Sequence, residues 1–439
     1  MSKTVAGDTV DAGTAVTRGR VVAWAFWDWG SAAFNAVVTT FVFTVYLTGS
    51  SFGDKNIISA QLGWALAIAG VFVAVLAPIS GQRSDTSGRR KFWLGVNTFI
   101  VVVITAAMFF VQASPGYLVL GLFLVSAGNV FFEFASVNYN AMLAQVSTPS
   151  TIGKVSGFGW GMGYLGGIVL LLVVYFGFIQ PAVGLFGVTG ENGLAVRVSM
   201  LLAAVWFGLA ALPVLLRVPE YRAPASLRRQ KVGFFTSYVV LGHDVARLWR
   251  TSRHTVYFLV ASAIFRDGLA GVFTFGGVLA ASVFGFSAGE VIIFAICANV
   301  VAGVATMSVG ALDDRLGAKP VIVTAFVGLL VSGLVVFFLH DGGQVVFWTA
   351  GLALTLFVGP AQSASRTFLA RLIPSGREGE VFGLYATTGR AVSFLAPTAF
   401  AIMVTIFGEA YWGILGIMLV LLIGLLLLLP VKAKQQQLR

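Results

Sequence analysis

Residues 81–91 read Gly81-Gln82-Arg83-Ser84-Asp85-Thr86-Ser87-Gly88-Arg89-Arg90-Lys91, and residues 310–319 read Gly310-Ala311-Leu312-Asp313-Asp314-Arg315-Leu316-Gly317-Ala318-Lys319. Both fit G-x-x-x-D-x-x-G followed by basic residues, and both lie between long apolar segments. The copies are 229 positions apart, each after the second apolar segment of its half. One copy is weak evidence, because Gly, Asp and Arg are common in tight loops. Two copies in register indicate a duplicated helical bundle, the arrangement from which secondary transporters build alternating access.

The composition is that of a membrane protein. The chain is 58% hydrophobic and 10% charged, whereas a soluble domain has roughly 25% charged residues. Its long apolar runs are sufficient to cross a bilayer as helices. We predict an all-α integral membrane protein with twelve spans, at 21–47, 57–80, 92–112, 117–140, 156–178, 197–216, 255–283, 287–309, 320–340, 345–366, 379–406 and 410–430. The first 20 residues are polar, so no cleaved signal is expected.

Lys and Arg fall overwhelmingly on one side of these spans, and the other side has only Lys55 and Arg197. By the positive-inside rule the basic side is cytoplasmic, which puts both termini in the cytoplasm. We expect a multi-pass protein of the plasma membrane. Its predicted parts are a tail at 1–20, a six-helix bundle at 21–216, a connector at 217–254, a second six-helix bundle at 255–431 and a tail at 432–439.

The net charge of +11 follows from this topology. A nucleic-acid partner is not expected, because the charges are spread over separate short loops rather than gathered on one face. Cys297 is the only cysteine, which excludes a disulfide or a cysteine metal site within one chain. We expect no metal, no cofactor and a monomer in the lipid bilayer.

The connector is the one sizeable polar stretch between the bundles. Its second part, residues 234–250, mixes apolar and basic residues at helical spacing, as in a helix that lies at the lipid headgroup layer. The simpler interpretation is a tether between the two bundles, and the alternative is a regulatory docking site.

Ionisable residues inside spans indicate where function lies, because an unpaired charge in hydrocarbon costs at least about 2.5–3.5 kcal/mol. Five residues qualify: Asp28, Glu133, Arg266, Asp267 and Arg390. Polar stripes at helical spacing surround them. The further members of these stripes that we select are Asn35, Asn129, Asn140, Gln362 and Arg366. The repeat offset of 229 maps Glu133 onto Gln362, so the two halves place polar side chains at matching depths.

Each charge also has a structural interpretation. Asp28 lies early in the first span and could be a helix-start charge near the interface. Arg266 and Asp267 could form structural ion pairs with neighbouring helices. We predict that Asp267 pairs with Arg390 across the seventh and eleventh spans, which leaves Arg266 or Arg366 for a substrate carboxylate.

The repeated loop resembles the cytoplasmic loop motif of the major facilitator superfamily. That resemblance implies that spans 1, 4, 7 and 10, which hold the polar stripes, line a central cavity. A carboxylate near the N-terminus of another helix is stabilised by the helix dipole, so Asp85 and Asp314 are interpreted as conformational latches rather than substrate ligands. The predicted latch residues are Gly81, Asp85, Gly88, Arg89, Gly310, Asp314, Arg315 and Gly317.

Four further regions are more specific. They are Trp27-Asp28-Trp29-Gly30-Ser31-Ala32-Ala33-Phe34, then Glu133–Ala141 with Val155–Gly167, then Phe265-Arg266-Asp267-Gly268, and Gln362–Arg366 with Phe382–Tyr385. They are similar to the autophagy-related vacuolar amino-acid effluxer family and its bacterial relatives, which usually have Ala-Asn in place of Gly30-Ser31. The resemblance implies a major facilitator fold and transport of small organic solutes, with amino-acid export as the best-known family activity.

We therefore predict a secondary transporter, not an enzyme, with two pseudo-symmetric six-helix halves that exports a small amino-acid-like solute. Proton coupling is expected at Glu133 or Asp267, because a dry cavity favours the protonated form of a carboxyl group. A membrane receptor or scaffold that reuses the fold is the alternative outside transport. A lipid or drug exporter is the alternative within it. That exporter would use an aromatic wall made of Trp24, Phe26, Trp27, Trp29, Phe131, Phe132 and Trp160.

Overall fold

The computed structural model describes residues 17–220, 234–286, 288–373 and 377–432. Within these residues, 12 helical segments are long and apolar enough to cross a membrane, from Arg18–Leu47 to Ala410–Leu428. This confirms the expected all-α fold with twelve spans. A helix satisfies its own backbone N–H and C=O groups, which is why apolar segments take this form where no water is present.

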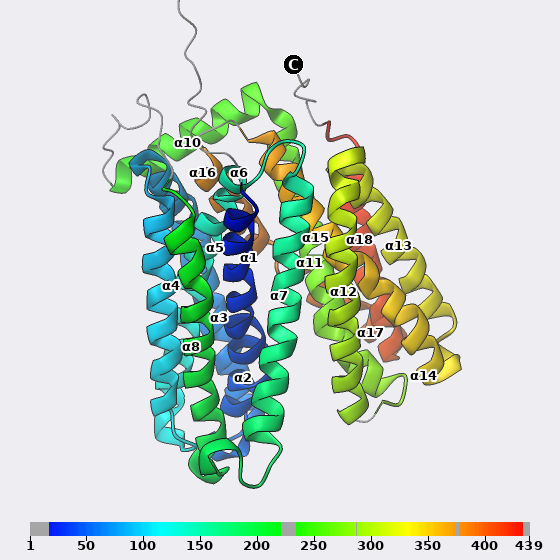
Figure 1. Ribbon diagram of the computed structural model, residues 1–439. Helices are drawn as coiled ribbons and strands as arrows, with labels where there is room; N and C mark the ends of the chain where they lie inside the picture. Colours follow the sequence, from blue (N-terminus) through cyan, green and yellow to red (C-terminus); the bar gives the residue numbers. More distant parts are fainter. Residues whose placement is uncertain (1–16, 221–233, 287, 374–376, 433–439) are drawn as a thin grey trace, which may run out of the picture.

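The first six spans form one group of long helices that run side by side (Figure 1). In the first span, α1 and α2 are joined by a π-helical segment, Ala33–Phe41. The helices of this N-terminal half are α1 (Arg18–Ala32), α2 (Phe43–Leu47), α3 (Lys55–Ser87), α4 (Arg90–Ala107), α5 (Leu118–Ala141), α6 (Leu143–Val146), α7 (Ile152–Val174) and α8 (Leu194–Arg217).

The last six spans form the second group. The connector contributes α10 (Phe234–Thr251), which crosses one end of the bundle in Figure 1, and residues 221–233 of the connector lie outside the described residues. The helices of this C-terminal half are α11 (Arg253–Ser282), α12 (Ala288–Leu316), α13 (Ala318–Phe338), α14 (Gly343–Val346), α15 (Leu352–Leu372), α16 (Glu378–Ala391), α17 (Leu395–Phe407) and α18 (Gly413–Leu428).

The eleventh span is broken in its middle. The helix α16 ends at Ala391, and α17 begins only at Leu395. Pro397 explains the break, because proline has no N–H and its ring clashes with the carbonyl four residues earlier in a continuous helix. In the first turn of a new helix neither problem arises. The break places a helix N-terminus inside the membrane-spanning region.

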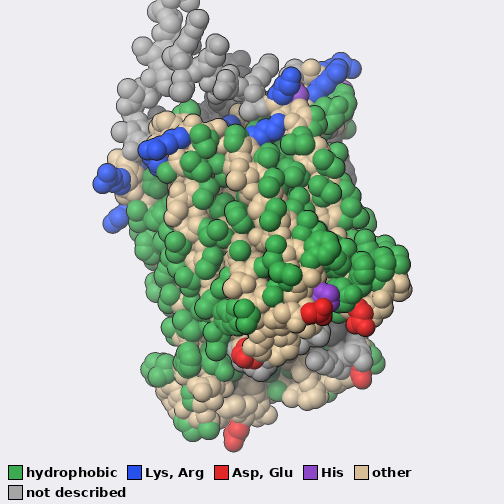
Figure 2. Space-filling view, turned by 90° about the vertical axis from the view of Figure 1, so that its right-hand side faces the viewer, with side chains coloured by type: hydrophobic (Ala, Val, Ile, Leu, Met, Phe, Trp, Pro, Cys, Tyr) green, Lys and Arg blue, Asp and Glu red, His purple; other side chains and the backbone are tan. Residues whose placement is uncertain are grey.

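Charged side chains separate along the long axis of the molecule. The two repeat loops and α10 lie at one end, which we call the loop end, and the opposite end is the far end (Figure 1). On the face that Figure 2 shows, Lys and Arg gather near the loop end and Asp and Glu near the far end, with hydrophobic side chains covering the band between them. This pattern is typical of a protein that spans a bilayer.

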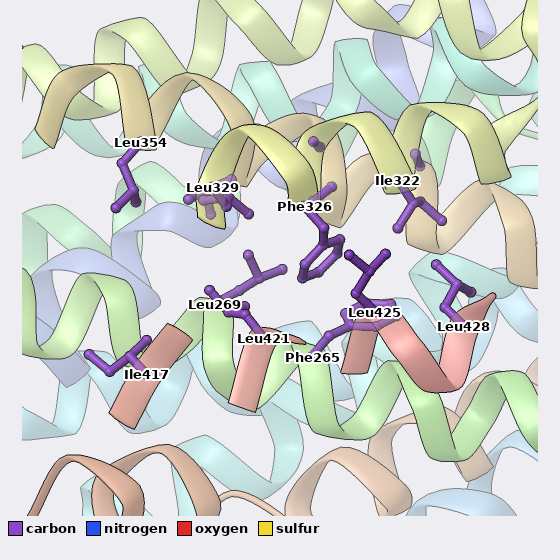
Figure 3. Packing of buried hydrophobic residues seen from close by; sticks show 14 of the residues in the cluster. Phe265, Leu269, Ile322, Phe326, Leu329, Leu354, Ile417, Leu421, Leu425 and Leu428 are labelled. Atoms are coloured by element: carbon purple, nitrogen blue, oxygen red, sulfur yellow. The ribbon is translucent and has the colours of Figure 1, made fainter. Parts of the chain in front are cut away.

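Each half has its own buried hydrophobic cluster. In the C-terminal half the cluster joins α11, α13 and α18, where the rings of Phe265 and Phe326 lie 4.9 Å apart and Leu421 packs beside them (Figure 3). The same cluster includes Val73 and Ala77 of α3. The halves are therefore packed against each other, and not only joined by the connector.

Glycines bring the two halves into backbone contact along the line where α7 meets α12. A Cβ added to Gly153 would lie 2.6 Å from the carbonyl oxygen of Gly310, and one added to Gly310 would lie 2.7 Å from that of Gly153. Small residues allow such close helix packing in lipid, where dispersion contacts replace the hydrophobic effect as the driving force. We call the whole surface where the two halves meet the seam. It includes this line and the contact of α3 with α16.

Candidate functional site

A buried ion pair joins the two halves within the spans, nearer to the loop end than to the far end. An Nη1 atom of Arg366, on α15, lies 3.5 Å from Oδ2 of Asp28, on α1. Arg366 also donates to the Ser156 hydroxyl at 2.9 Å, to the Ser156 carbonyl at 2.7 Å and to Asn140 Oδ1 at 3.3 Å. All three partners belong to the N-terminal half. Asp28 is thus not a helix-start charge, because its partner lies across the seam.

Aromatic rings surround this guanidinium. Its Cζ atom lies 5.2 Å from the ring centre of Trp24, 5.6 Å from that of Trp160 and 5.9 Å from that of Tyr139. The Tyr139 hydroxyl donates to Asp28 Oδ2 at 3.0 Å, and its ring stacks on Trp24. Only 4% of the Arg366 surface is exposed. Rings at these distances stabilise a desolvated cation, so Arg366 is held by the opposite half.

A second ion pair also joins the halves, and it corrects one prediction. Arg390 Nη2, on α16, pairs with Glu133 Oε1 on α5 and donates to Asn129 Oδ1 at 3.2 Å. The predicted pairing of Arg390 with Asp267 is wrong. The cause is the break in the eleventh span, because Arg390 lies just before the break and faces α5. The Arg390 and Glu133 side chains are 34% and 23% exposed, so this pair is more accessible than Asp28–Arg366.

Asp267 instead caps the helix that follows the break. Its Oδ2 accepts a hydrogen bond from the backbone N–H of Ala396 at 2.6 Å, in the first turn of α17. A carboxylate satisfies the unpaired N–H groups of a helix N-terminus and is stabilised by the helix dipole. The bond joins α11 to α17 within the C-terminal half.

These contacts predict the outcome of two double-mutant cycles. Arg390 and Glu133 should couple by about 0.5–3 kcal/mol, the range for residues in direct contact, whereas Arg390 and Asp267 should be additive within about 0.5 kcal/mol. The measurement is the free energy of unfolding of the single and double variants in one detergent. Coupling of Arg390 to Asp267 that exceeds its coupling to Glu133 would contradict the geometry.

Arg266 has no carboxylate partner among the described residues. Its Nη1 donates to the Tyr385 carbonyl at 2.9 Å, and its Cζ lies 3.8 Å from the centre of the Tyr385 ring. A guanidinium over a ring face is attracted by the ring quadrupole, which holds the side chain in place without neutralising it. The expected structural ion pair of Arg266 is therefore not formed in the described part of the chain.

The symmetry-related positions Glu133 and Gln362 both make contacts across the seam. Glu133 pairs with Arg390, and Gln362 Oε1 accepts a hydrogen bond from the Tyr164 hydroxyl at 2.8 Å. Asn35, in the π-helical part of the first span, has an exposed side chain. The structure thus brings most of the predicted polar residues to the seam. Asp267 instead contacts α17 of its own half.

The first repeat loop binds the start of α16 in the opposite half. Asp85 Oδ2 accepts a hydrogen bond from the Glu380 N–H at 3.0 Å, and Oδ1 accepts one from Arg90 Nε at 2.7 Å. Arg90 also pairs with Glu378 Oε2 at 2.6 Å. Asp85 and Arg90 are 3% and 0% exposed. The carboxylate therefore joins a helix N-terminus to a buried cation.

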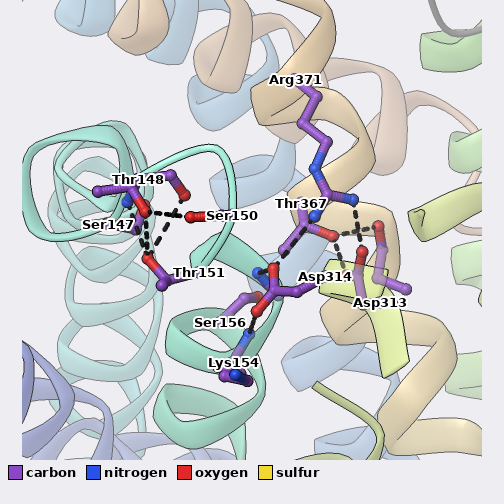
Figure 4. A network of polar contacts seen from close by, with 12 residues as sticks. Ser147, Thr148, Ser150, Thr151, Lys154, Ser156, Asp313, Asp314, Thr367 and Arg371 are labelled. Atoms are coloured by element: carbon purple, nitrogen blue, oxygen red, sulfur yellow. Dashed lines mark hydrogen bonds and ion pairs between the residues drawn. The ribbon is translucent and has the colours of Figure 1, made fainter. Parts of the chain in front are cut away.

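The second repeat loop binds the start of α7 in the same manner (Figure 4). The carboxylate of Asp314 accepts hydrogen bonds from the N–H groups of Gly153 and Lys154 at 2.6 and 2.9 Å. Arg371 Nη1 lies 2.5 Å from Oδ1 of the neighbouring Asp313, which also accepts a hydrogen bond from the Thr367 hydroxyl. The two loops form related cross-half contacts, and both contacts lie at the loop end.

The remaining loop residues separate into two groups. Gly88 and Gly317 have φ values of 66° and 88°, a left-handed conformation that glycine adopts without steric cost. Arg89 and Arg315 are exposed, so the structure places neither of them among the buried contacts. The cations that face the loop carboxylates are Arg90 and Arg371 instead.

Asp85→Asn is expected to shift the protein from a closed towards an open loop end while substrate binding is kept. Asparagine keeps an acceptor for the Glu380 N–H and removes the charge that faces Arg90. The charge–dipole part alone is worth about 0.3–1 kcal/mol at an exposed helix end and up to about 2 kcal/mol at a buried one such as that of Asp85, enough to change populations several-fold.

A cysteine at Ala77, which is buried where α3 meets α16, reports opening of the loop end through its rate of alkylation. The background carries Cys297→Ser. The matched control is Asp341→Asn, because the Asp341 side chain is 96% exposed at the far end. Equal alkylation rates in the two variants would count against the latch role of Asp85.

Comparison with known proteins places the chain in a family. A protein-family model described as vacuole effluxer Atg22 like matches residues 63–438. The chain belongs to this family. An uncharacterized MFS-type transporter of Bacillus subtilis, YxiO, is 25% identical to this Atg22-like chain over 409 residues, covering 92% of the chain and 93% of YxiO. Autophagy-related protein 22 of Cryptococcus neoformans is 26% identical over 289 residues, covering 62% of the chain and 49% of that protein.

Solved structures establish the fold of the Atg22-like chain. The proton:xylose symporter XylE, a major facilitator superfamily protein, superposes with a TM-score of 0.73 at 15% sequence identity, covering 94% of each chain. The predicted major facilitator fold is confirmed. The family model and the similarity to the MFS-type transporter YxiO make the chain a membrane transporter of this superfamily and not an enzyme.

Several residues of the Atg22-like site were not predicted. They are Arg90, Tyr139, Ser156, Asp313 and Arg371. Arg90 and Asp313 adjoin predicted loop residues, so the repeat located them to within one position. No pattern identifies Ser156 as a partner of Arg366, because the two lie 210 positions apart and meet only through packing of the halves.

Proposed function

We propose that this Atg22-like chain exports a small amino-acid-like solute across the plasma membrane by alternating access, driven by protons. The observation that carries the proposal is that two ion pairs within the spans, Asp28–Arg366 and Glu133–Arg390, have their partners in opposite halves. Buried ion pairs contribute little to stability, because desolvation offsets the attraction. An ion pair with one partner in each half has a different role, because movement of the halves changes the distance between the two charges.

The cross-half contacts favour a state that is closed at the loop end. Asp85 and Asp314 each hold a helix N-terminus of the opposite half there. We take the loop end to be cytoplasmic, because it gathers Lys and Arg. In this state the cytoplasmic side is closed, and separation of the halves at the loop end opens it.

Glu133 is the proposed proton carrier. Its cation, Arg390, belongs to the opposite half, so movement of the halves changes the charge that faces this carboxylate. Asp267 is less suited to this role, because its bond to the Ala396 N–H lies within one half and does not depend on the position of the other.

The aromatic wall of an amphiphile exporter is not favoured. Trp24, Trp27 and Phe132 are 0%, 2% and 7% exposed and belong to the core of the N-terminal half. The ring of Trp160 faces Arg366. Of the seven predicted wall residues, these four support the helices and the guanidinium, whereas Phe26 is 36% exposed.

Transport by the purified chain in proteoliposomes tests the proposal. With a proton gradient imposed, labelled amino acids should accumulate above their external concentration, and a protonophore should abolish the accumulation. A scaffold would give the flux of protein-free vesicles. An amphiphile exporter would show competition by amphiphiles and none by amino acids.

A further inference from the structure

Two guanidinium nitrogens of Arg266 have no hydrogen-bond partner among the described residues. The two are Nε and Nη2, whereas Nη1 bonds to the Tyr385 carbonyl. Neither atom is among the fully buried polar atoms of the described residues that lack a partner, and the residue as a whole is half-buried. A guanidinium that presents two adjacent N–H donors matches the two oxygens of a carboxylate.

Arg266 also lies beside the place where the halves meet. A Cβ built on Gly389 would be 3.1 Å from Arg266 Nη1 and 3.2 Å from Nη2. The next residue, Arg390, pairs with Glu133 of the N-terminal half. The guanidinium of Arg266 therefore packs against the residue that precedes Arg390, beside the ion pair that the transport cycle is proposed to break. Arg266, Arg390 and Glu133 together have one positive charge in excess.

The negative charges of this region already have partners. Asp28 lies beside Arg366 and accepts from the Tyr139 hydroxyl, and Glu133 pairs with Arg390. Asp267 caps α17 and is 7% exposed. A ligand ammonium would have to displace Arg390 from Glu133 or Arg366 from Asp28. Either exchange strands a cation in the spans, which is costly.

We infer that Arg266 binds the carboxylate of the substrate and that the site holds no counter-charge for an ammonium group, so its substrate class is organic carboxylates in general. The inference rests on the proposed transport function and deepens it. Amino acids are bound through the carboxylate alone, and the hydroxy acid with the same carbon skeleton fits equally well.

Matched probes that differ in one group test the inference. For each carbon skeleton, from alanine to phenylalanine, the amino acid, its hydroxy acid and its amide are titrated against the purified full chain, and binding is read from thermal stabilisation. The hydroxy acid should bind within a factor of about three of the amino acid, because neither loses a counter-charge. The amide should bind about tenfold more weakly or worse, because it loses a charge-assisted hydrogen bond.

Variants of Arg266 show whether this residue causes the preference for the acid over the amide. Arg266→Gln should remove the discrimination between acid and amide, and Arg266→Lys should weaken acid binding but keep the discrimination, because lysine keeps the charge and lacks the fork of donors. Arg217→Gln is the matched control, since Arg217 is exposed at the end of α8 and its loss changes the net charge equally. Should Arg266→Gln fail to fold, Arg266→Lys still measures the dependence on donor geometry.

Three outcomes would overturn the inference. Binding of amino acids with hydroxy acids at least about tenfold weaker would show that the ammonium is recognised, and the proposed function would stand. If Arg266→Gln still discriminates fully between acid and amide, a residue other than Arg266 binds the carboxylate. No stabilisation by any acid, together with no acid transport in proteoliposomes, would reject the proposed function as well.

Discussion

Arg366→Met is expected to lower the free energy of unfolding by about 3–5 kcal/mol, because removal of one partner leaves a buried charge uncompensated. Asp28 would keep the Tyr139 hydroxyl and lose its only cation among the described residues. Asn140 would lose this donor as well, whereas the Ser156 hydroxyl would still accept from the Ser363 hydroxyl. Thermal unfolding of the purified chain, with and without lipid, measures the loss.

A second substitution distinguishes the cost of leaving Asp28 unpaired from the cost of lost packing around Arg366. The double variant Arg366→Met with Asp28→Leu should regain much of the stability, because replacement of both partners by apolar groups removes the unpaired charge. The control Arg217→Met alters an exposed arginine and should stay within about 0.5 kcal/mol of the unmodified chain. A single variant Arg366→Met that melts with the control would contradict the buried pair.

Glu133→Gln is expected to abolish accumulation of substrate against a gradient while exchange of substrate across the membrane continues. Glutamine keeps the hydrogen-bonding capacity beside Arg390 and Asn129, but it cannot bind and release a proton. Two assays in the same proteoliposomes separate these effects: uptake driven by a proton gradient, and counterflow without one. We expect the first to fall to the level of protein-free vesicles.

The matched control for this prediction is Glu191→Gln, an exposed glutamate at the far end whose replacement changes the net charge equally. It should accumulate substrate like the unmodified chain. If Glu133→Gln also accumulates substrate, the proton is carried elsewhere, and Asp28 becomes the next residue to test. If Glu133→Gln loses counterflow too, Glu133 is needed for the movement itself.

The prediction of span number and repeat succeeded because both depend on local composition. A segment of about 20 apolar residues must form a helix in hydrocarbon wherever its neighbours lie. The loop aspartates were also placed at helix N-termini in advance, since Asp85 and Asp314 occur in a repeated loop and a carboxylate is favoured at such a helix end. The partner helices, α16 and α7, could not be named from the repeat.

The sequence alone determined the twelve spans and the two related halves, because hydropathy is a property of single segments. Only the tertiary structure decided which charges meet. Asp267 and Arg390 looked complementary in sequence, yet the break before Pro397 turns Arg390 towards Glu133 and gives Asp267 a helix N-terminus. Helical spacing gives the face on which a side chain lies, whereas its partner depends on how two separate segments pack and where a helix stops.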